Sequence, residues 1–241
     1  MTTRDPLAPP SSNEPVRVLA RAEGVVLAYK PASWATEPTP QSADSVVRAV
    51  ALELGARQVH AASRLDVGVS GVVLCTVDRA AHRLVAQLRM AGELAHRYLG
   101  LASGTLTGEG CWGRPLGRSH DAAGRAVART HGPGLREART AYQCLATTGA
   151  TASLLRFTPE TGRMHQIRAH AAAAGHPLLG DRRYGGGSLV TTPSGRVLPL
   201  SRVALHCAEL RIGTLLTAHA PAPLELRQLW TELGGSDSDW P

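Results

Sequence analysis

Two polar segments, one early and one late in the chain, constrain the fold most, because each adjoins an element that the sequence predicts with little ambiguity. The first is Ser63–Asp66, which a Gly-containing turn joins to the apolar run Val72–Val77. A short apolar run without alternation is typical of a strand buried on both faces. The second is Thr161–His170, whose helix, predicted over His165–Ala174, would end at Gly175–Pro177. We therefore expect the acid of the first segment to lie in a turn held by a rigid strand.

The rest of the chain alternates short strands with helices. The expected elements are a hairpin over Val16–Lys30 that turns at Glu23-Gly24, helices over Asp44–Leu54 (with Asp44 as the N-cap), Arg79–Met90 and Pro223–Leu233, and strands over Tyr98–Ala102, Thr140–Ala146, Ser153–Phe157 and Val203–Ile212. Strands in mixed order, with helices between them, predict an α+β fold.

The charge of the chain allows a nucleic-acid partner but does not require one. The net charge is +7, and of the 26 basic residues only Lys30 is a lysine. Arginine grips phosphate bidentately and stacks on bases, yet a GC-rich genome would also raise the content of Arg, Ala and Gly. The irregular stretch 103–139 holds six Arg within 114–139, against Asp121 and Glu137. This stretch is either a solvated face or a loop that follows a nucleic-acid backbone.

The sequence offers no pattern for a metal, a membrane or secretion. The four cysteines (75, 111, 144 and 207) are far apart and form no CxxC pair, so we expect buried free thiols in a reducing cytosol. The polar, Pro-rich start lacks the blocks of a signal peptide. No apolar run approaches the roughly 20 residues that a bilayer requires. We expect a cytoplasmic protein without a membrane partner.

Three motifs in fixed order make the chain resemble the RluA family of RNA pseudouridine synthases. They are Arg64-Leu65-Asp66 followed by Ser70-Gly71, Tyr98 within His96–Gly104, and Arg168 within Thr161–His170. The resemblance runs from about Val25 to Trp230. It implies the pseudouridine synthase fold, with a mixed, mostly antiparallel central sheet, flanking helices and a catalytic cleft between two lobes. It also divides the chain into a disordered N-terminal lead (1–15), a catalytic domain (16–233) and a C-terminal tail (234–241).

The resemblance implies that the chain isomerises a specific uridine of structured RNA, either rRNA or tRNA, to pseudouridine. The reaction breaks the bond from uracil N1 to ribose C1′ and joins C5 to C1′, which calls for a nucleophile or carboxylate in a site that excludes water. It uses no cofactor and no metal, and no obligate protein partner is implied. Since only about 15 residues precede the predicted domain, we expect the domain itself to select the RNA.

The resemblance assigns catalysis to Asp66, Tyr98 and Arg168. Asp66 would be the nucleophilic carboxylate, attacking either the ribose or the base, although its local sequence alone favours an Asx-turn. Tyr98 would pack on the target uracil and assist removal of the C5 proton, unless it is only a half-buried strand residue. Arg168 would pair with the carboxylate and keep it ionised, unless it is only a surface residue of its helix.

Other residues are expected to contact RNA or to support the site. Arg64 would enter the gap left when the target uridine flips out of the stack. Arg163 and His165 would contact phosphate or support the pocket, or else cap the helix. The residues expected to follow the RNA backbone are Arg118, Arg125 and Arg129; those expected to hold the helix-to-loop architecture are His170, His176 and Asp181.

Two departures from the family pattern keep other functions open. Ser63 stands where the family usually has His, and His96 stands where it usually has Lys. One alternative is a catalytically inactive RNA-binding protein that retains the pseudouridine synthase fold. Another is a basic protein with a small-molecule substrate, against which Arg64 and the Arg-rich stretch weigh.

Overall fold

The computed structural model describes residues 14–39, 44–149 and 151–241 and divides into two compact units. The N-terminal unit comprises the described part of Pro10–Tyr98 together with His206–Ala222, and the C-terminal unit comprises Leu99–Leu205 together with Pro223–Pro241. Residues 1–13 of the predicted disordered lead lie outside the described residues. No helix of the described chain is long and apolar enough to cross a membrane.

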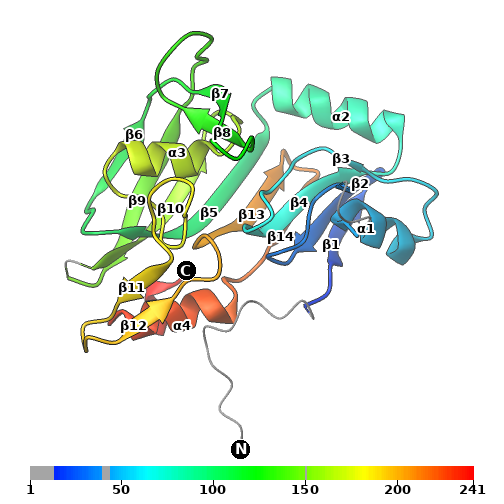
Figure 1. The fold of residues 1–241 in the computed structure, drawn as a ribbon. Helices are drawn as coiled ribbons and strands as arrows, with labels where there is room; N and C mark the ends of the chain where they lie inside the picture. Colours follow the sequence, from blue (N-terminus) through cyan, green and yellow to red (C-terminus); the bar gives the residue numbers. More distant parts are fainter. Residues whose placement is uncertain (1–13, 40–43, 150) are drawn as a thin grey trace, which may run out of the picture. The chain divides into compact units, whose positions relative to one another are not determined.

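The N-terminal unit is built on a buried sheet (Figure 1). Its strands are β1 (Arg17–Ala22), β2 (Val25–Lys30), β3 (His60–Ala61), β4 (Ser70–Thr76), β13 (Leu205–Ile212) and β14 (Leu216–His219). Their order is β1-β2-β4-β13, with β3 paired to β4 and β14 to β13. The β4–β13 pair is parallel, and the other pairs are antiparallel. β1 and β2 pair as the predicted hairpin. Every residue of β2 and of β4 is buried, which confirms the predicted buried strand.

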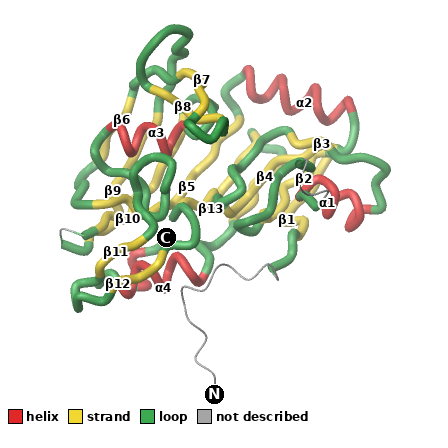
Figure 2. The backbone as a smooth tube through the Cα atoms, viewed as in Figure 1, coloured by secondary structure: helices red, strands yellow, loops and turns green. Residues whose placement is uncertain are grey.

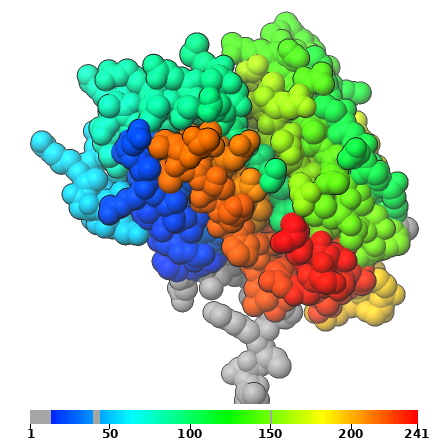
Figure 3. Space-filling model, turned by 180° about the vertical axis from the view of Figure 1, so that it is seen from behind, coloured from blue at the N-terminus to red at the C-terminus, as the bar shows by residue number. Residues whose placement is uncertain are grey.

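Two helices cover the N-terminal unit. The first, α1 (Val46–Leu54), packs on β1 and β2, and the second, α2 (Arg79–Met90), packs on β2 and β4. The strands β1 and β14 lie beside each other, which is visible from behind in Figure 3 as the blue and orange surfaces.

The predicted N-cap of the first helix was wrong by one residue. Ser45 is the N-cap of α1, because its extended backbone lets its side chain accept a hydrogen bond from the Arg48 N–H. Asp44 precedes the cap, although Asp and Ser serve this position about equally well. The predicted bounds of α2 are confirmed, and its N-cap Asp78 accepts a hydrogen bond from the Ala81 N–H.

The C-terminal unit has a second group of strands, in the order β5-β10-β9-β6. Their bounds are β5 (Leu94–Ser103), β10 (Ala152–Pro159), β9 (Thr140–Thr147) and β6 (Glu109–Trp112). β5 begins in the N-terminal unit and enters this one at Leu99. The predicted start of this strand at Tyr98 is wrong. The strand begins four residues earlier, at Leu94, so Tyr98 lies in its middle.

Helices and two hairpins complete the C-terminal unit. The hairpins pair β7 (Gly117–His120) with β8 (Ala126–Arg129) and β11 (Leu189–Thr191) with β12 (Val197–Pro199); the helices are α3 (Gln166–Ala173), α4 (Leu224–Glu232) and the short 3-10 helix η1 (Asp237–Asp239). The stretch 103–139, expected to be irregular, contains β6, β7 and β8 joined by loops (Figure 2). The α+β class and the mostly antiparallel pairing are confirmed.

Candidate functional site

Asp66 lies in a turn that two buried polar side chains hold in place. The turn closes with a hydrogen bond from the Val69 N–H to the Asp66 carbonyl (2.9 Å), directly before β4. The preceding Leu65 is buried, and its backbone exchanges two hydrogen bonds with the Thr36 hydroxyl (3.1 and 3.2 Å). On the other side, Lys30 donates to the Val67 carbonyl (3.1 Å). The predicted placement of the acid on a rigid element is therefore confirmed.

Lys30 is the principal support of this turn, and the sequence analysis missed it. Its side chain is fully buried, and its Nζ donates to the carbonyls of Pro31 (3.0 Å), Trp34 (2.7 Å) and Val67 (3.1 Å). Three donors matched to three carbonyls are what an ammonium group requires in a dry interior. The available signal was a single lysine at the end of a wholly apolar strand.

The departure at Ser63 has a structural role in this chain. The Ser63 hydroxyl accepts a hydrogen bond from the Leu74 N–H (2.9 Å), and the Ser63 N–H donates to the Leu74 carbonyl (3.0 Å). The segment before the acid is thus bound to β4. Arg64, next along the chain, is 68% exposed and forms an ion pair with Glu37 (3.1 Å). An exposed ion pair of this kind contributes little stability, so Arg64 can exchange Glu37 for another partner.

Tyr98 is linked to both the acid and the neighbouring strand. A side-chain hydrogen bond between Tyr98 and Cys207 contributes to the pKa shifts of both residues. Burial raises the pKa of Tyr98 well above its ordinary value, and nearby Cys207 and the charge of Asp66 raise it further. The phenol is therefore held in its neutral form. Cys207 itself, buried on β13, has its pKa raised to about 12 by burial.

Gly71 of the motif lets β13 approach closely enough for this contact. Its φ is +119°, and a Cβ at this position would lie 2.2 Å from the Cys207 carbonyl oxygen. Beside it, the Ser70 hydroxyl contacts His206 Nδ1 (2.9 Å), and His206 Nε2 reaches the Ala220 carbonyl (2.8 Å). Ser70-Gly71 therefore joins β4 to β13 and brings Cys207 to the tyrosine.

His96, the second departure from the family pattern, stacks on the tyrosine. The two rings lie on the same side of β5, with centroids 6.3 Å apart and planes 16° apart. Burial lowers the pKa of His96 to about 4, and the charge of Arg89 lowers it further. At neutral pH this position therefore carries a neutral ring rather than the cation of a lysine.

Arg168 is a buried residue of α3, so the alternative of a surface helix arginine is wrong. It is 9% exposed, and its Nε and Nη2 donate to the two carboxylate oxygens of Asp181, both at 2.7 Å. The guanidinium also lies 5.1 Å from the centre of the Tyr184 ring. Asp181 thus has the architectural role expected of it. The predicted pairing of Arg168 with Asp66 remains a prediction.

The start of α3 is organised by Gln166 rather than by the residues expected to cap it. The Gln166 side-chain oxygen accepts hydrogen bonds from the Arg163 N–H (3.0 Å) and the Thr161 hydroxyl (2.7 Å). His165 occupies the N-cap position with φ of +52°, but its side chain makes no cap hydrogen bond. Its Nδ1 instead contacts the Tyr184 hydroxyl (2.8 Å). The helix-capping alternative for the His165 side chain is therefore wrong.

The other two histidines of this region hold loops, as predicted. His170 Nδ1 contacts the Thr140 hydroxyl (2.9 Å), and its Nε2 contacts the Arg114 carbonyl (2.8 Å). His176 Nδ1 contacts the Ser103 carbonyl (3.0 Å).

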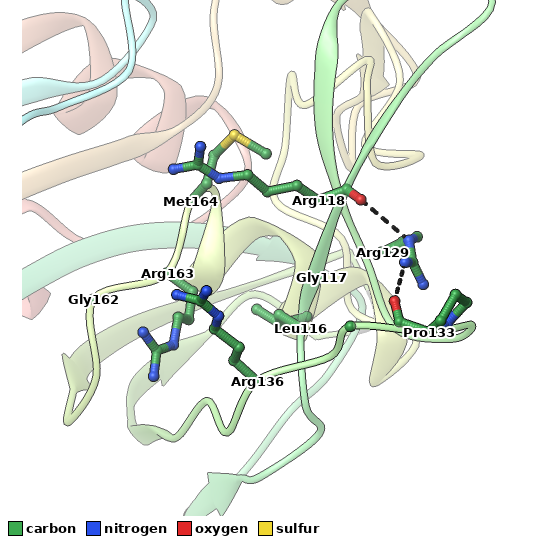
Figure 4. Close-up of a pocket in the computed structure, with 10 residues that line it drawn as sticks. Leu116, Gly117, Arg118, Arg129, Pro133, Arg136, Gly162, Arg163 and Met164 are labelled. Carbon is green, nitrogen blue, oxygen red and sulfur yellow. Dashed lines mark hydrogen bonds between the residues drawn. The ribbon is translucent and has the colours of Figure 1, made fainter.

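The three arginines expected to follow RNA differ in their surroundings. Arg129 donates from its Nε to the Arg118 carbonyl (3.2 Å) and from its two terminal nitrogens to the carbonyls of His131 and Pro133. Arg125 forms an ion pair with Asp121 (2.8 Å). Arg118 lines a cavity of about 500 Å³ in the C-terminal unit, to which Arg163 also contributes (Figure 4).

Cysteines and potential metal ligands are dispersed. All four cysteines are free thiols. Cys75 and Cys207 are buried as expected, whereas Cys111 is exposed and Cys144 is half-buried, so the expectation is wrong for these two. Within residues 14–39, 44–149 and 151–241, His, Cys, Asp and Glu form no group of three or more that could hold a metal ion.

Comparison with known proteins points to one family. Residues 24–173 match the family described as RNA pseudouridylate synthase. The RNA pseudouridine synthase YhcT of Bacillus subtilis (strain 168) is 35% identical over 180 residues, 72% of this chain and 55% of that protein. Ribosomal large subunit pseudouridine synthase D of Nitrosomonas europaea is 34% identical over 176 residues, 69% of this chain and 48% of that protein. The chain thus matches about half the length of these two relatives.

Solved structures agree on the fold. The structure of human RNA Pseudouridylate Synthase Domain Containing 4 matches with a TM-score of 0.69 and 21% identity, over 90% of this chain and 92% of that one. The structure of human RNA Pseudouridylate Synthase Domain Containing 1 matches with a TM-score of 0.65 and 22% identity, over 92% and 86%. At this level of identity the likeness concerns the fold alone.

Proposed function

We propose, because the chain belongs to the RNA pseudouridylate synthase family and within it to the RluA family, that it converts a specific uridine of structured RNA to pseudouridine. The observation that carries the proposal is the position of Asp66. It lies in a turn fixed by Lys30 and Thr36, close enough to Tyr98 for its charge to raise the pKa of the phenol. Both residues also lie inside the segment that matches the family.

The reaction is an isomerisation, so its bonds and protons balance without another reactant. The bond from N1 to C1′ breaks, the base turns, and C5 bonds to C1′; C5 loses a proton and N1 gains one. Asp66 supplies the carboxylate that acts as nucleophile, at the ribose or at the base. The support on both sides of its turn keeps the carboxylate oriented before the RNA arrives, which lowers the cost of reaching the reactive geometry.

Tyr98 contributes its ring rather than a base. A phenol whose pKa is raised stays protonated at neutral pH, so it is a poor acceptor for the C5 proton. Its ring can pack on the extruded uracil, and a base–aromatic stack contributes roughly 1–3 kcal/mol. His96, neutral and stacked on it, extends this aromatic surface.

Arg168 supplies a guanidinium whose orientation is set by Asp181 and Tyr184. In the proposed complex it pairs with Asp66 and orients that carboxylate. Arg64, which within the described part of the chain pairs with the exposed Glu37 alone, enters the gap left by the flipped uridine. Flipping costs a few kcal/mol, which the inserted side chain partly offsets.

The proposed substrate is a folded rRNA or tRNA in the cytoplasm, recognised without an obligate protein partner. Folded RNA is recognised largely by shape and by its backbone, which suits a chain with a net charge of +7. The name of the Nitrosomonas relative refers to the ribosomal large subunit, which makes large-subunit rRNA the first RNA to test.

The decisive experiment maps pseudouridines across total RNA from cells with and without the gene, read as carbodiimide-induced stops of reverse transcription. We expect one or a few stops to disappear in the deletion strain. Wild-type protein should restore them, whereas Asp66→Asn should not, although its affinity for the RNA should stay within several fold. If Asp66→Asn restores the stops, Asp66 is not the nucleophile. If the deletion changes no stop in any RNA, the inactive RNA-binding protein becomes the leading hypothesis.

A further inference from the structure

We propose that the cavity lined by Arg118, Arg136 and Arg163 binds a phosphodiester group of the substrate RNA. The inference rests on the proposed function for the identity of the ligand, because an RNA substrate supplies the phosphate. It goes beyond that function by assigning a site for a backbone phosphate, and it adds Arg136 to the residues expected to contact RNA.

The cavity gathers positive charge without a compensating acid. It has a volume of about 500 Å³, and ten residues line it. Four of the ten are arginines, and none is Asp or Glu. Like charges that converge on one space repel one another, so an anion between these guanidinium groups would be stabilised.

Three of these arginines have donors available for a ligand. Among the described residues, neither Arg118 nor Arg136 makes a side-chain hydrogen bond or an ion pair, and both are exposed. Arg163 uses only its Nε, which donates to the Glu137 carbonyl (2.9 Å), so its terminal nitrogens remain for a ligand. Figure 4 shows the three side chains reaching the cavity from three different segments of the chain.

The fourth arginine is part of the scaffold. Arg129 donates to the carbonyls of Arg118, His131 and Pro133, and so ties the turn after β8 to β7, as the dashed lines of Figure 4 show. The backbone of Arg136 is fixed in turn, because it exchanges two hydrogen bonds with Leu116 (2.9 Å each). The guanidinium-bearing segments are therefore held in place before a ligand binds, which reduces the ordering cost of binding.

The chemistry of the lining favours phosphate in a polymer. Guanidinium groups bind phosphate oxygens through two parallel N–H donors, with both charge and geometry matched. The cavity is larger than a phosphate requires, and Leu116 and Met164 give it an apolar side against which a ribose can lie. Contacts to phosphate position an RNA without reading its sequence, so this site would set the register of the RNA rather than choose the base.

The experiment compares RNA affinity and its salt dependence in two double variants of equal charge. Arg118→Gln/Arg136→Gln removes two cavity arginines; Arg196→Gln/Arg227→Gln removes two arginines that are paired to Glu232 and Asp237 outside the cavity. The probe is a fluorescein-labelled RNA stem-loop with a uridine loop, titrated by anisotropy at several salt concentrations. Circular dichroism confirms that each variant is folded.

We expect the cavity variant to lose two phosphate contacts and the control to lose none. Each contact adds about 0.9 to the slope of log affinity against log salt, so the slope should fall by about 1.8 and the affinity at about 0.1 M salt should fall about 60-fold. Arg118→Lys/Arg136→Lys should recover most of the slope, because lysine keeps the charge. Equal losses in both double variants would overturn the proposal, since the effect would then be one of net charge.

Two further outcomes distinguish a failure of this inference from a failure of the proposed function. The binding assay needs no turnover, so it can be repeated on the Asp66→Asn background; if the deletion strain loses no pseudouridine but the cavity variant still loses affinity, only the proposed function fails. The second outcome is that inorganic phosphate raises the thermal unfolding temperature of the wild-type protein but not that of the cavity variant, while the two proteins bind RNA equally well. In that case the site binds free phosphate, and the inference about RNA is overturned.

Discussion

Replacing Lys30 by Met tests whether one buried side chain holds the turn that carries Asp66. The Lys30 Nζ donates to three backbone carbonyls at 2.7 to 3.1 Å from a fully buried position. Methionine keeps a long unbranched apolar stem but donates no hydrogen bond. The substitution therefore removes the three donors while leaving most of the packing of β2 in place.

The expected loss of stability depends on which backbone carbonyls are left without a hydrogen-bond donor. The Val67 carbonyl keeps a second donor, the Ser33 N–H at 2.9 Å. Within the described residues, the carbonyls of Pro31 and Trp34 accept no hydrogen bond other than those from Lys30. A buried acceptor left without a donor costs about 1–3 kcal/mol, and a hydrogen bond from a charged group contributes about 1.5–3 kcal/mol. We expect Lys30→Met to lower the free energy of unfolding by roughly 3–5 kcal/mol, a large fraction of the total for a domain.

Two assays measure this effect. Urea titration gives the free energy of unfolding, with Leu27→Met as the matched control: Leu27 is also fully buried on β2, and a swap of similar apolar volume costs less than about 1.5 kcal/mol. Because Lys30 is the only lysine, an amine-reactive reagent reports it without interference except from the α-amino group. The reasoning is refuted if Lys30 reacts in the native protein as fast as in urea, or if Lys30→Met is as stable as the Leu27 control.

Two more substitutions test the buried pair of α3 and the aromatic surface. Asp181→Asn leaves Arg168 with an incomplete partner in a buried site, so we expect a loss of about 2–4 kcal/mol in the free energy of unfolding. Asp237→Asn removes one member of an exposed pair, so it should change the free energy of unfolding little; equal losses for the two variants in urea titration would contradict this. The pKa of His96 is lowered from 6.5 to about 4, so between these values the unfolded chain binds more protons and stability is lost as the pH falls. Between about pH 7 and pH 5 the free energy of unfolding should fall by up to about 2 kcal/mol. Urea titrations at the two pH values should show this fall in the wild-type protein but not in His96→Gln.

The sequence predicted the elements whose signals are local. The helix Arg79–Met90 has an N-cap residue, a helical period and an end within one short segment, and its bounds are confirmed. The buried strand Ser70–Thr76 was predicted within two residues, because an apolar run of this length has few alternatives. The start of β5 was missed because its first residues, Leu94–Arg97, alternate too weakly in polarity to reveal a strand without its neighbours.

Contacts between distant segments could not be predicted in the same way. Asp66 and Tyr98 were predicted as site residues from motifs, but the hydrogen bond between Tyr98 and Cys207 depends on which strand lies beside β4. The same limit applies to Lys30, whose carbonyl partner at Val67 is 37 residues away. A sequence records which groups are polar, whereas the fold decides which of them meet.

The arginines show why the composition could not decide between a nucleic-acid partner and a codon bias. A net charge of +7 counts every guanidinium equally, although their partners differ. Arg129 lies in the Arg-rich stretch but binds three backbone carbonyls, so most of its donors serve the protein itself. Arg118 and Arg136, a short distance along the same stretch, face a cavity that has no acid. A codon bias would raise the number of arginines but would not by itself place arginines with available donors around one cavity. The argument for RNA therefore depends on the partners of each guanidinium rather than on the number of arginines.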